Sequence, residues 1–390
     1  MATKYLFLSL PLDAFDSSDK GEALSSLESI TSGNASVVPL NIPSFKIGTL
    51  DALVQQADDL GKMEAACAGV VSKVADSLKS LLGGDENKIA QHKKINETST
   101  DQYVSSFAWN KVLYRPDKPL AELVSMLQKE VVSVDNDVKS KVNQYNAAKT
   151  NLTALERQRT GNLSTKSLAS VVDPSVLVRD SEYLESHLIA VPKSSRKEFL
   201  QSYETLTELV VPRSALQVAD DDEFVLFSVV TFKKTSTEFL QKSREQKWIP
   251  RQFKATESGE EDEQRQLDRA VQEEKKAWAE AIRMVVTGWS EIVQVWLHIV
   301  TLRVFVEAVL RYGLPLDYVN SIVKTTPKNV KKVKTALDSN YSYLGGNAVS
   351  RDKKGNVAED AALAAEMAAA GLGSSASDYS AYVYYEVEIP

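Results

Sequence analysis

The segment DVKSKVNQYNAAKTNLTALERQR, residues Asp137–Arg159, decides how the chain folds. It contains no proline, no glycine and few large apolar residues, so it is predicted to be helical throughout without lining a compact core. An apolar stripe with alternating steps of four and three residues runs through it, and only Lys141 interrupts the stripe. The stripe consists of Leu120, Val124, Leu127, Val131, Val134, Val138, Lys141, Tyr145, Ala148, Leu152 and Leu155. Such a pattern, sustained over about five heptads, is typical of a helix that packs along its length on one partner.

A second stripe with the same spacing lies more than a hundred residues further along the chain and supplies the partner helix. Its positions are Leu267, Val271, Glu274, Trp278, Ala281, Val285, Gly288, Ile292, Val295, Ile299, Leu302, Val306 and Val309. Glu274 and Gly288 are the two poor positions in it. RYGLP, residues Arg311–Pro315, ends the helix with a cation, a glycine and a proline.

Two long helices separated by a globular-looking segment most simply pair antiparallel, over a shared stretch of roughly 50 Å. If Leu155 lies opposite Leu267, Lys141 comes close to Glu280, and this pair would help to set the register. The middle of the chain is then carried at one end of a rod, and the termini meet at the other. The alternative is one large helical bundle, because the inner end of the second helix, EIVQVWLHIVTLRVFVEAVL, is apolar on several faces.

The segment between the helices, residues 161–255, is predicted to be a distal α+β module. LIAVPK and FVLFSVVTFK have the composition of strands, and an amphipathic helix follows each of them. A capping box opens each helix, Ser195 with Glu198 in the first and Thr235 with Glu238 in the second. The EFLQ that both helices contain is compatible with an internal duplication and also with chance.

The remaining residues, 1–119 and 301–390, are predicted to form a proximal module from both ends of the chain. YLFLSLP, SVVPLNIP and the final YVYYEVEI are strand-like, and we expect the first and last of these strands to share one sheet. A long amphipathic helix is expected from Thr49 to Leu82. Two segments are expected to be loops, Ser17–Ser36 and Asp352–Asp378.

The predicted fold class is therefore α+β and elongated, with two globular modules joined by a long antiparallel coiled-coil neck. The neck consists of residues 120–160 and 256–300. The proximal module forms a foot at one end of this neck, and the distal module forms a head at the other.

Net charge and composition limit the classes of partner and the cellular compartment that are expected. A net charge of −7 and a pI near 5.3 argue against a nucleic-acid partner, which requires a dense basic surface. Apolar stretches are interrupted by charges before the roughly 18 to 20 residues that cross a bilayer, so no direct membrane span is expected, and the N-terminus does not match a secretory signal. Cys67 is the single cysteine and is expected to be a small buried side chain in a reducing cytosolic compartment.

No pattern typical of catalysis is present. The three histidines, His92, His187 and His298, have no metal-ligand spacing, and His298 is expected to be a satisfied structural residue. The acidic run Asp220–Glu223 suits a cation, but a solvated loop ahead of a strand is the favoured interpretation. Phosphate-loop, dinucleotide-binding, nucleophile-elbow and zinc-protease motifs are missing. No catalytic residue, cofactor or metal is therefore assigned.

Partner proteins are expected to bind basic and aromatic residues of the distal module, because arginine and large aromatic side chains dominate protein interfaces. The candidates are Lys193, Arg196, Lys233, Lys234, Trp248, Arg251 and Phe253. The alternative is that Trp248, Ile249 and Phe253 pack the module onto its neck.

Several stretches, in this order along the chain, resemble one family, the C subunits of the vacuolar-type proton-translocating ATPase (V-ATPase). They are IPSFKIGTLDALV, YNAAKTNLTALERQRTGNLSTKSL, LIAVPKS, FVLFSVVTFKK, KWIPRQF, WLHIVTLRVFVEAVLRYGLP and YLGGNA. The resemblance spans nearly the whole chain and departs in the two expected loops.

The resemblance implies a non-catalytic protein with a foot, a neck and a head, cytoplasmic and peripheral on the cytosolic face of vacuolar or other endomembranes. It implies that the head holds a peripheral stalk of paired E and G subunits. The foot would meet a second such stalk and the cytosolic domain of the membrane-sector a subunit. It also implies control of reversible assembly, and actin or nucleotide binding is associated with the family. The rival interpretations are a coiled-coil adaptor or actin tether, and then an enzyme.

Overall fold

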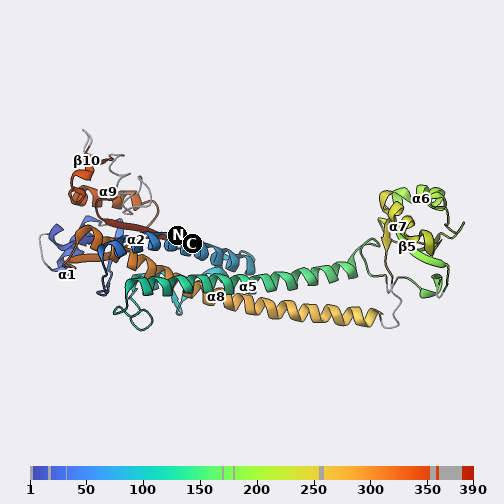
Figure 1. Cartoon of the computed structure of the whole chain (residues 1–390), viewed down its shortest axis with the longest axis horizontal. Helices are drawn as coiled ribbons and strands as arrows, with labels where there is room; N and C mark the ends of the chain where they lie inside the picture. Colours follow the sequence, from blue (N-terminus) through green and yellow to red (C-terminus); the bar gives the residue numbers. More distant parts are fainter. Residues whose placement is uncertain are drawn as a thin grey trace. The chain divides into compact units, whose positions relative to one another are not determined.

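The computed structural model describes residues 3–15, 19–31, 33–168, 171–178, 181–253, 259–351, 357–359 and 380–390 (Figure 1). The chain divides into two compact units. Unit 1 contains Met1–Val142 and Glu280–Pro390, and unit 2 contains Asn143–Ala279. Each unit has its own sheet and its own apolar core.

Unit 1 is built on a four-stranded antiparallel sheet with the order β12-β1-β9-β2. The strands are β1 (Lys4–Pro11), β2 (Ala35–Pro39), β9 (Tyr318–Thr325) and β12 (Val383–Glu388). Lys4 lies opposite Glu388 and Ser9 lies opposite Val383, so the prediction that the first and last strands share one sheet is confirmed. The strand β9 was not predicted, because this central strand is buried on both faces and shows no alternation of apolar and polar residues.

One face of this sheet packs against α1 (Lys20–Ile30) and α9 (Val330–Tyr341). Leu6, Leu8 and Leu10 of the first strand form a core with side chains of both helices. The expectation of a loop over Ser17–Ser36 is therefore wrong for most of that segment. Its serines and acids concealed a helix whose Ala23, Leu24, Leu27 and Ile30 recur at helical spacing and face the sheet.

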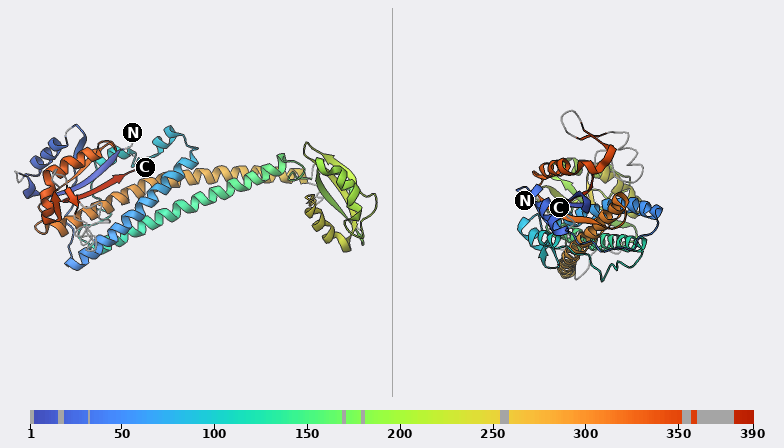
Figure 2. Two further views of the ribbon diagram at one scale, coloured as in Figure 1. Left: turned by 90° about the horizontal axis from the view of Figure 1, so that it is seen from above. Right: turned by 90° about the vertical axis from the view of Figure 1, so that its left-hand side faces the viewer.

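The other face of the sheet lies toward α2 (Leu50–Leu81) and the C-terminal part of α8 (Gly259–Tyr312), which lie below the sheet in Figure 1 and in the right-hand view of Figure 2. The bounds of α2 agree with the predicted helix, and the Thr49 hydroxyl caps it by accepting a hydrogen bond from the Ala52 N–H at 3.3 Å. Cys67 on α2 is fully buried, with its sulfur 4.0 Å from the carbonyl oxygen of Ile292 on α8. Its predicted role as a small buried side chain is confirmed.

Charged groups on α8 connect it to its neighbours in unit 1. Arg303 forms an ion pair with Glu64 of α2, and its guanidinium lies 4.3 Å from the ring centre of Tyr385 on β12. Arg311 pairs with Glu307 one turn before it and also donates to the backbone carbonyl of Ser380. These contacts fix the apolar end of α8 between the long helix and the last strand, and each buried charge has a partner.

The helix α5 (Leu120–Thr160) contacts α8 within unit 1. Lys141 Nζ lies 2.9 Å from Glu280 Oε2, which confirms the predicted pair. Three residues earlier on α5, Val138 lies against Gly288, which is eight residues later on α8, so the two helices run in opposite directions here. A Cβ at Gly288 would lie 2.7 Å from Val138 Cγ2, so the helices approach too closely at this interruption of the stripe for a larger residue to fit unchanged.

His298 of α8 lies at the centre of an aromatic cluster. Its Nε2 accepts a hydrogen bond from the Asn110 N–H at 3.1 Å, and Nδ1 lies 2.6 Å from the carbonyl oxygen of Gln294. Nδ1 therefore carries the proton, and the ring is neutral. The rings of Phe107, Trp109 and Tyr114 all lie about its imidazole, with centroid distances of 4.7 to 5.1 Å. The expectation of a satisfied structural histidine is confirmed.

Among the described helices, α8 alone is long and apolar enough by composition to cross a membrane, although Glu291, Arg303 and Glu307 interrupt its apolar run as expected. Residues 262–312 contain an 18-residue window that is long and apolar enough by composition. However, 83% of that window is buried inside the structure, as in the core helix of a folded domain. Packing within the protein thus accounts for its apolar character.

Unit 2 contains a second antiparallel sheet with the order β6-β7-β5-β8. Its strands are β5 (Leu184–Pro192), β6 (Leu216–Asp220), β7 (Phe224–Phe232) and β8 (Ile249–Arg251). The helices α6 (Arg196–Ser202) and α7 (Ser236–Glu245) cover one face through Phe199 and Phe239. The segment around Leu163, Leu168 and Val172 covers part of the other face.

The prediction of two capping boxes is wrong. Neither Ser195 nor Thr235 makes a side-chain cap hydrogen bond, because each closes a 3-10 turn whose backbone has already left the extended conformation. Each strand nevertheless leads through a three-residue turn into its helix in the same order.

The remaining elements are short. In unit 1 they are α3 (Glu86–His92), β3 (Lys94–Ile95), β4 (Thr98–Ser99), α4 (Thr100–Ser105), β10 (Val349–Arg351) and β11 (Val357–Glu359). The 3-10 turns are Leu12–Ala14, Pro174–Val176, Lys193–Ser195, Tyr203–Thr205, Lys233–Thr235 and Ser342–Ala348. Of the expected loop Asp352–Asp378, only β11 lies inside the described residues.

We predict that Gly288→Ala destabilises the protein although alanine is the better helix former. The new methyl group would clash with the stiff Val138 side chain, and such overpacking costs about 1–3 kcal/mol of unfolding free energy. The matched control is Gly69→Ala on α2, where a Cβ meets nothing within 4 Å and the helix should gain about 0.5–1 kcal/mol. Urea denaturation measures both, and equal shifts of the same sign would contradict the helix contact.

We predict that His298 makes stability depend on pH. Burial lowers its pKa from 6.5 to about 4, so the unfolded chain binds a proton that the folded chain refuses, and stability falls as pH drops from 6.5 toward 4. Between pH 7.5 and pH 5.0 this imidazole alone should cost about 2 kcal/mol. Denaturation at both pH values, compared with His298→Gln, measures the difference, and an unchanged pH dependence in the variant would refute it.

Candidate partner-binding surfaces

The basic residues singled out from the sequence lie at two opposite ends of the unit 2 sheet. Lys193 and Arg196 follow the end of β5, whereas Lys233 and Lys234 follow the end of β7. These two strands are antiparallel, and Pro192 at the end of β5 is paired with Phe224 at the start of β7. The structure therefore separates the two pairs by the length of the strands.

The other three candidates make contacts inside unit 2. Trp248 is only 1% exposed and packs with Phe199 in the core beneath α6, with their ring centroids 4.9 Å apart. The guanidinium of Arg251 donates to the backbone carbonyls of Leu163 and Lys166 at 3.3 and 2.6 Å. Phe253 is partly buried on the same covered face. Trp248 and Phe253 thus pack inside unit 2, whereas Ile249 is 38% exposed; packing of these residues onto a neck stays a prediction.

The Lys193 end is occupied by intramolecular contacts. Lys193 lies 3.9 Å from Asp220, and Arg196 donates to Gln217 at 2.9 Å. Asp221 accepts backbone hydrogen bonds from Glu223 and Phe224 at 2.8 and 2.6 Å and shapes the turn before β7. Burial of its carboxyl opposes ionisation, but backbone N–H donors keep its pKa below the usual value. The acidic run is thus a turn, as favoured from the sequence.

The Lys233 end carries exposed apolar side chains that were not predicted from the sequence. Backbone hydrogen bonds join Phe232 to Leu209 at 3.1 Å and Lys233 to Tyr183 at 2.9 Å. Tyr183 is 64% exposed, and Leu209 and Phe232 are each 37% exposed. Together with Lys233 and Lys234, whose side chains form no ion pair with another described residue, these residues form what we term the β7-end surface.

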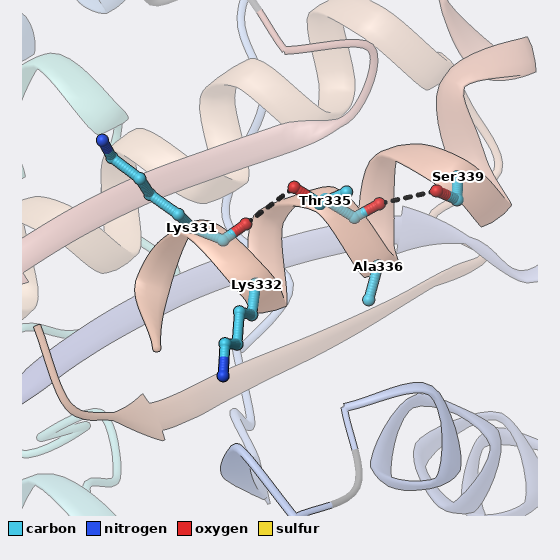
Figure 3. A pocket seen from close by; sticks show the side chains of 5 residues that line it. All are labelled: Lys331, Lys332, Thr335, Ala336 and Ser339. Atoms are coloured by element: carbon cyan, nitrogen blue, oxygen red, sulfur yellow. Dashed lines mark hydrogen bonds between the residues drawn. The ribbon is translucent and has the colours of Figure 1, made fainter. Parts of the chain in front are cut away.

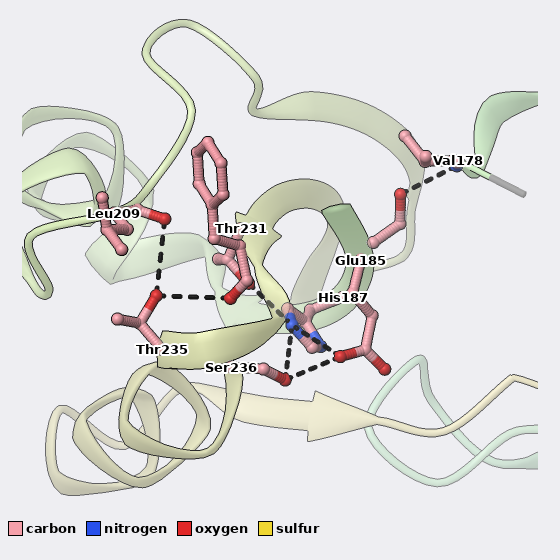
Figure 4. Close-up of polar contacts among 9 residues, drawn as sticks. Val178, Glu185, His187, Leu209, Thr231, Thr235 and Ser236 are labelled. Atoms are coloured by element: carbon pink, nitrogen blue, oxygen red, sulfur yellow. Dashed lines mark hydrogen bonds and ion pairs between the residues drawn. The ribbon is translucent and has the colours of Figure 1, made fainter. Parts of the chain in front are cut away.

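A polar cluster around buried His187 adjoins the β7-end surface (Figure 4). His187 Nε2 lies 3.0 Å from Thr231 Oγ1 and 3.1 Å from Ser236 Oγ, and Ser236 donates to Glu185 at 2.8 Å. Burial lowers the pKa of His187, with Glu185 acting in the opposite direction. Thr235 Oγ1 also donates to the carbonyl of Leu209 at 3.5 Å. The cluster locks the starts of β5 and α7 and the end of β7 to one another.

The side chains of His187, Glu185, Thr231 and Ser236 do not form a catalytic relay. In a serine–histidine–acid arrangement, the hydroxyl and the carboxylate contact different ring nitrogens. Here Ser236, Thr231 and the more distant Glu185 all approach Nε2 of His187. The contacts of His187 therefore favour a structural role, in which they stabilise the neighbouring β7-end surface.

A hollow of about 420 Å³ lies on α9 in unit 1, lined by Lys331, Lys332, Thr335, Ala336 and Ser339 (Figure 3). The hydroxyls of Thr335 and Ser339 donate to backbone carbonyls one turn earlier, both at 2.8 Å. All its described lining residues come from a single helix, so polar groups from different elements do not converge there. Within the described ranges, no three histidine, cysteine or acidic side chains are placed to hold a metal ion.

Comparison with known proteins identifies relatives over almost the full length. The family model for the C subunit of V-ATPase matches residues 5–383. The V-type proton ATPase C subunit of Saccharomyces cerevisiae is 37% identical over 358 residues, which cover 91% of each chain. The V-type proton ATPase C 1 subunit of Rattus norvegicus is 36% identical over 89% of this chain and 88% of its own.

A search of solved structures returns the cytoplasmic N-terminal domain of the V-ATPase I subunit, described as a homolog of the a subunit. It covers 86% of this chain and 96% of its own at 13% identity and a TM-score of 0.37, which is too low to establish a common fold.

We predict that Trp248→Ala destabilises unit 2 by about 3–5 kcal/mol, because it removes a fully buried ring from the core. The neighbouring Ile249→Ala is the control, since Ile249 is 38% exposed and its truncation should cost about 1 kcal/mol or less. Chemical denaturation, monitored by hydrogen exchange of the unit 2 amides, measures the loss of unfolding free energy in both variants. Equal losses of unfolding free energy from the two substitutions would mean that Trp248 does not stabilise the core of unit 2.

Proposed function

The chain belongs to the family of V-ATPase C subunits, and we propose that it acts as a non-catalytic stator component of a V-type proton-pumping ATPase. In this role it bridges peripheral stalks, each a pair of E and G subunits, and the cytosolic domain of the membrane-sector a subunit. The observation that carries the proposal is that α5 and α8 both run from one compact unit into the other. Two modules with their own cores, joined by two helices, suit a tie between separate partners.

We propose further that α5 and α8 continue their pairing as an antiparallel coiled-coil neck between a foot and a head. The ion pair of Lys141 with Glu280 and the close contact of Val138 with Gly288 support this, because they fix register and direction in unit 1. Burial of each seam side chain would contribute about 1.5–3 kcal/mol, which favours a stiff connection. A stiff tie is what a stator requires, since the non-rotating parts must resist torque.

Reversible assembly of the catalytic and membrane sectors follows from the same arrangement. Two modest sites joined by a rigid span can exceed either site alone by about 10²- to 10⁴-fold in affinity without any new contact. Weakening one end removes this gain and releases the protein. Control of sector assembly therefore needs a change at only one of the two ends.

In the head, we propose the β7-end surface as the site for a peripheral stalk. Its exposed tyrosine, phenylalanine and leucine supply apolar contact area, and the neighbouring lysines favour an acidic rim on the partner. The polar cluster of His187, Thr231 and Ser236 would hold this surface in one conformation before binding. The assembled protein would be cytoplasmic and peripheral on the cytosolic face of vacuolar or other endomembranes, supporting their acidification.

The second candidate function is a coiled-coil adaptor or actin tether, which the long heptad stripes also favour. It differs in its expected partner. An actin tether cosediments with filaments as an isolated chain and has no affinity for a stalk of E and G subunits.

We predict that the full chain binds two pairs of E and G subunits, and that Lys233→Glu with Lys234→Glu reduces this number to one. The reversed charges would repel the acidic rim of the partner and lower affinity at that end by at least about tenfold. Mass photometry with excess stalk pairs counts the bound copies. The expected loss should also diminish as salt rises, since the contacts are solvent-exposed.

The matched control is Lys197→Glu with Arg244→Glu, which makes the same charge change on exposed residues outside the β7-end surface. This control should still bind two pairs. If the unmodified chain binds no more than one pair, bridging of stalks is refuted; if both double variants lose one pair, net charge and not the β7-end surface is responsible.

A further inference from the structure

The loop between α4 and α5 presents large apolar side chains to solvent. Val112 is 91% exposed, the highest value among the large apolar residues in the described part of the chain, and its neighbour Leu113 is 50% exposed. Lys111 precedes them and is also exposed. We term residues 111–113 the loop tip.

The backbone of the loop tip is fixed by local hydrogen bonds. The Asn110 side-chain oxygen accepts from the N–H groups of Val112 and Leu113 at 3.1 and 3.0 Å. The Asn110 carbonyl accepts from the Tyr114 N–H at 2.9 Å and closes one tight turn. An asparagine that caps its own turn in this way holds the tip in a single shape.

The base of the turn is anchored in the core of unit 1. Trp109 and Tyr114, on either side of the tip, are 5% and 2% exposed, and Trp109 Nε1 donates to the Tyr114 carbonyl at 2.7 Å. The Asn110 N–H donates to buried His298 on α8, and the Tyr114 hydroxyl bonds Glu130 on α5. Two long helices and an aromatic cluster thus position a tip whose Val112 side chain is almost fully exposed and whose Leu113 side chain is half exposed. Such pre-organisation reduces the entropy lost on binding.

The chemistry of the loop tip indicates the kind of partner that fits it. Arg115 is paired with Asp117 and Lys118 with Glu122, at 2.9 and 2.6 Å. Lys111 forms no ion pair with any residue in the described ranges, so the tip combines two aliphatic side chains with one uncompensated cation. Its complement is an apolar hole with an acidic rim. The surface of an α-helix offers such holes between four of its side chains, and glutamates are common beside the apolar seam of a helical pair.

We propose that the loop tip is the contact through which unit 1 binds an α-helical stalk pair, with Val112 and Leu113 entering an apolar hole and Lys111 meeting its acidic rim. This deepens the bridging function proposed above and rests on it. A bilayer is a poorer fit, because stable interfacial binding needs a larger apolar face and several cations.

The experiment uses the full chain and counts bound pairs of E and G subunits by mass photometry. Val112→Asp should reduce the count from two to one, with at least a tenfold loss of affinity at the foot. Val112→Asp combined with Lys233→Glu and Lys234→Glu should reduce the count to none. Val112 is almost fully exposed, so its substitution should leave the thermal unfolding temperature unchanged.

Val132→Asp is the matched control, because Val132 of α5 is also an exposed valine of unit 1, at 53%, and lies outside the loop tip. It should retain both pairs. The inference is overturned if Val112→Asp still binds two pairs, if it loses only the cytosolic domain of the membrane-sector a subunit, or if the chain binds vesicles of 30% phosphatidylserine through Val112. A normal chain that binds at most one pair would instead refute the bridging function itself.

Discussion

The close approach of α5 and α8 at Gly288 is the constraint on which the rest of the structure depends. Only a residue without a side chain leaves room for Val138 there, and further toward unit 2 Lys141 pairs with Glu280. Both helices continue past this contact into unit 2, so the neck proposed above would take its register from this point. A slip by one residue would turn the apolar stripe of α5 away from α8 and expose it.

The long helices were predictable because their signal is periodic and repeated. Each heptad adds independent evidence, so a single poor position such as Lys141 does not obscure the pattern. The central strand β9 and the helix α1 were missed for the opposite reason. β9 is buried on both faces and has no alternation, and α1 offers only a few apolar positions among serines and acids. Their identity is fixed by the sheet on which they pack, which a local pattern does not contain.

The candidate surfaces were less predictable than the fold, because exposure is a property of tertiary structure. Residue type alone placed Trp248 among the partner-binding residues, yet the ring lies under α6 in the core of unit 2. Conversely, Phe232 ends an apolar strand and reads as core, but the covering segment on that face stops short of it. The four basic candidates are similar in sequence context, and antiparallel pairing of β5 with β7 separates them into two pairs.

The β7-end surface and the loop tip are built in the same way, and this similarity is relevant to how the protein would be released. In each, solvent-exposed aliphatic or aromatic groups are held by a buried histidine that accepts or shares hydrogen bonds from the same segment, His187 in unit 2 and His298 in unit 1. Burial lowers the pKa of each imidazole, so both are neutral near pH 7 and their hydrogen-bond geometry is fixed. If these surfaces bind partners as proposed, their rigidity would limit the entropy lost on binding, and the small number of side chains would keep each affinity modest. In the function proposed above, tight association would depend on both ends being engaged together, and loss of contact at either end would free the chain.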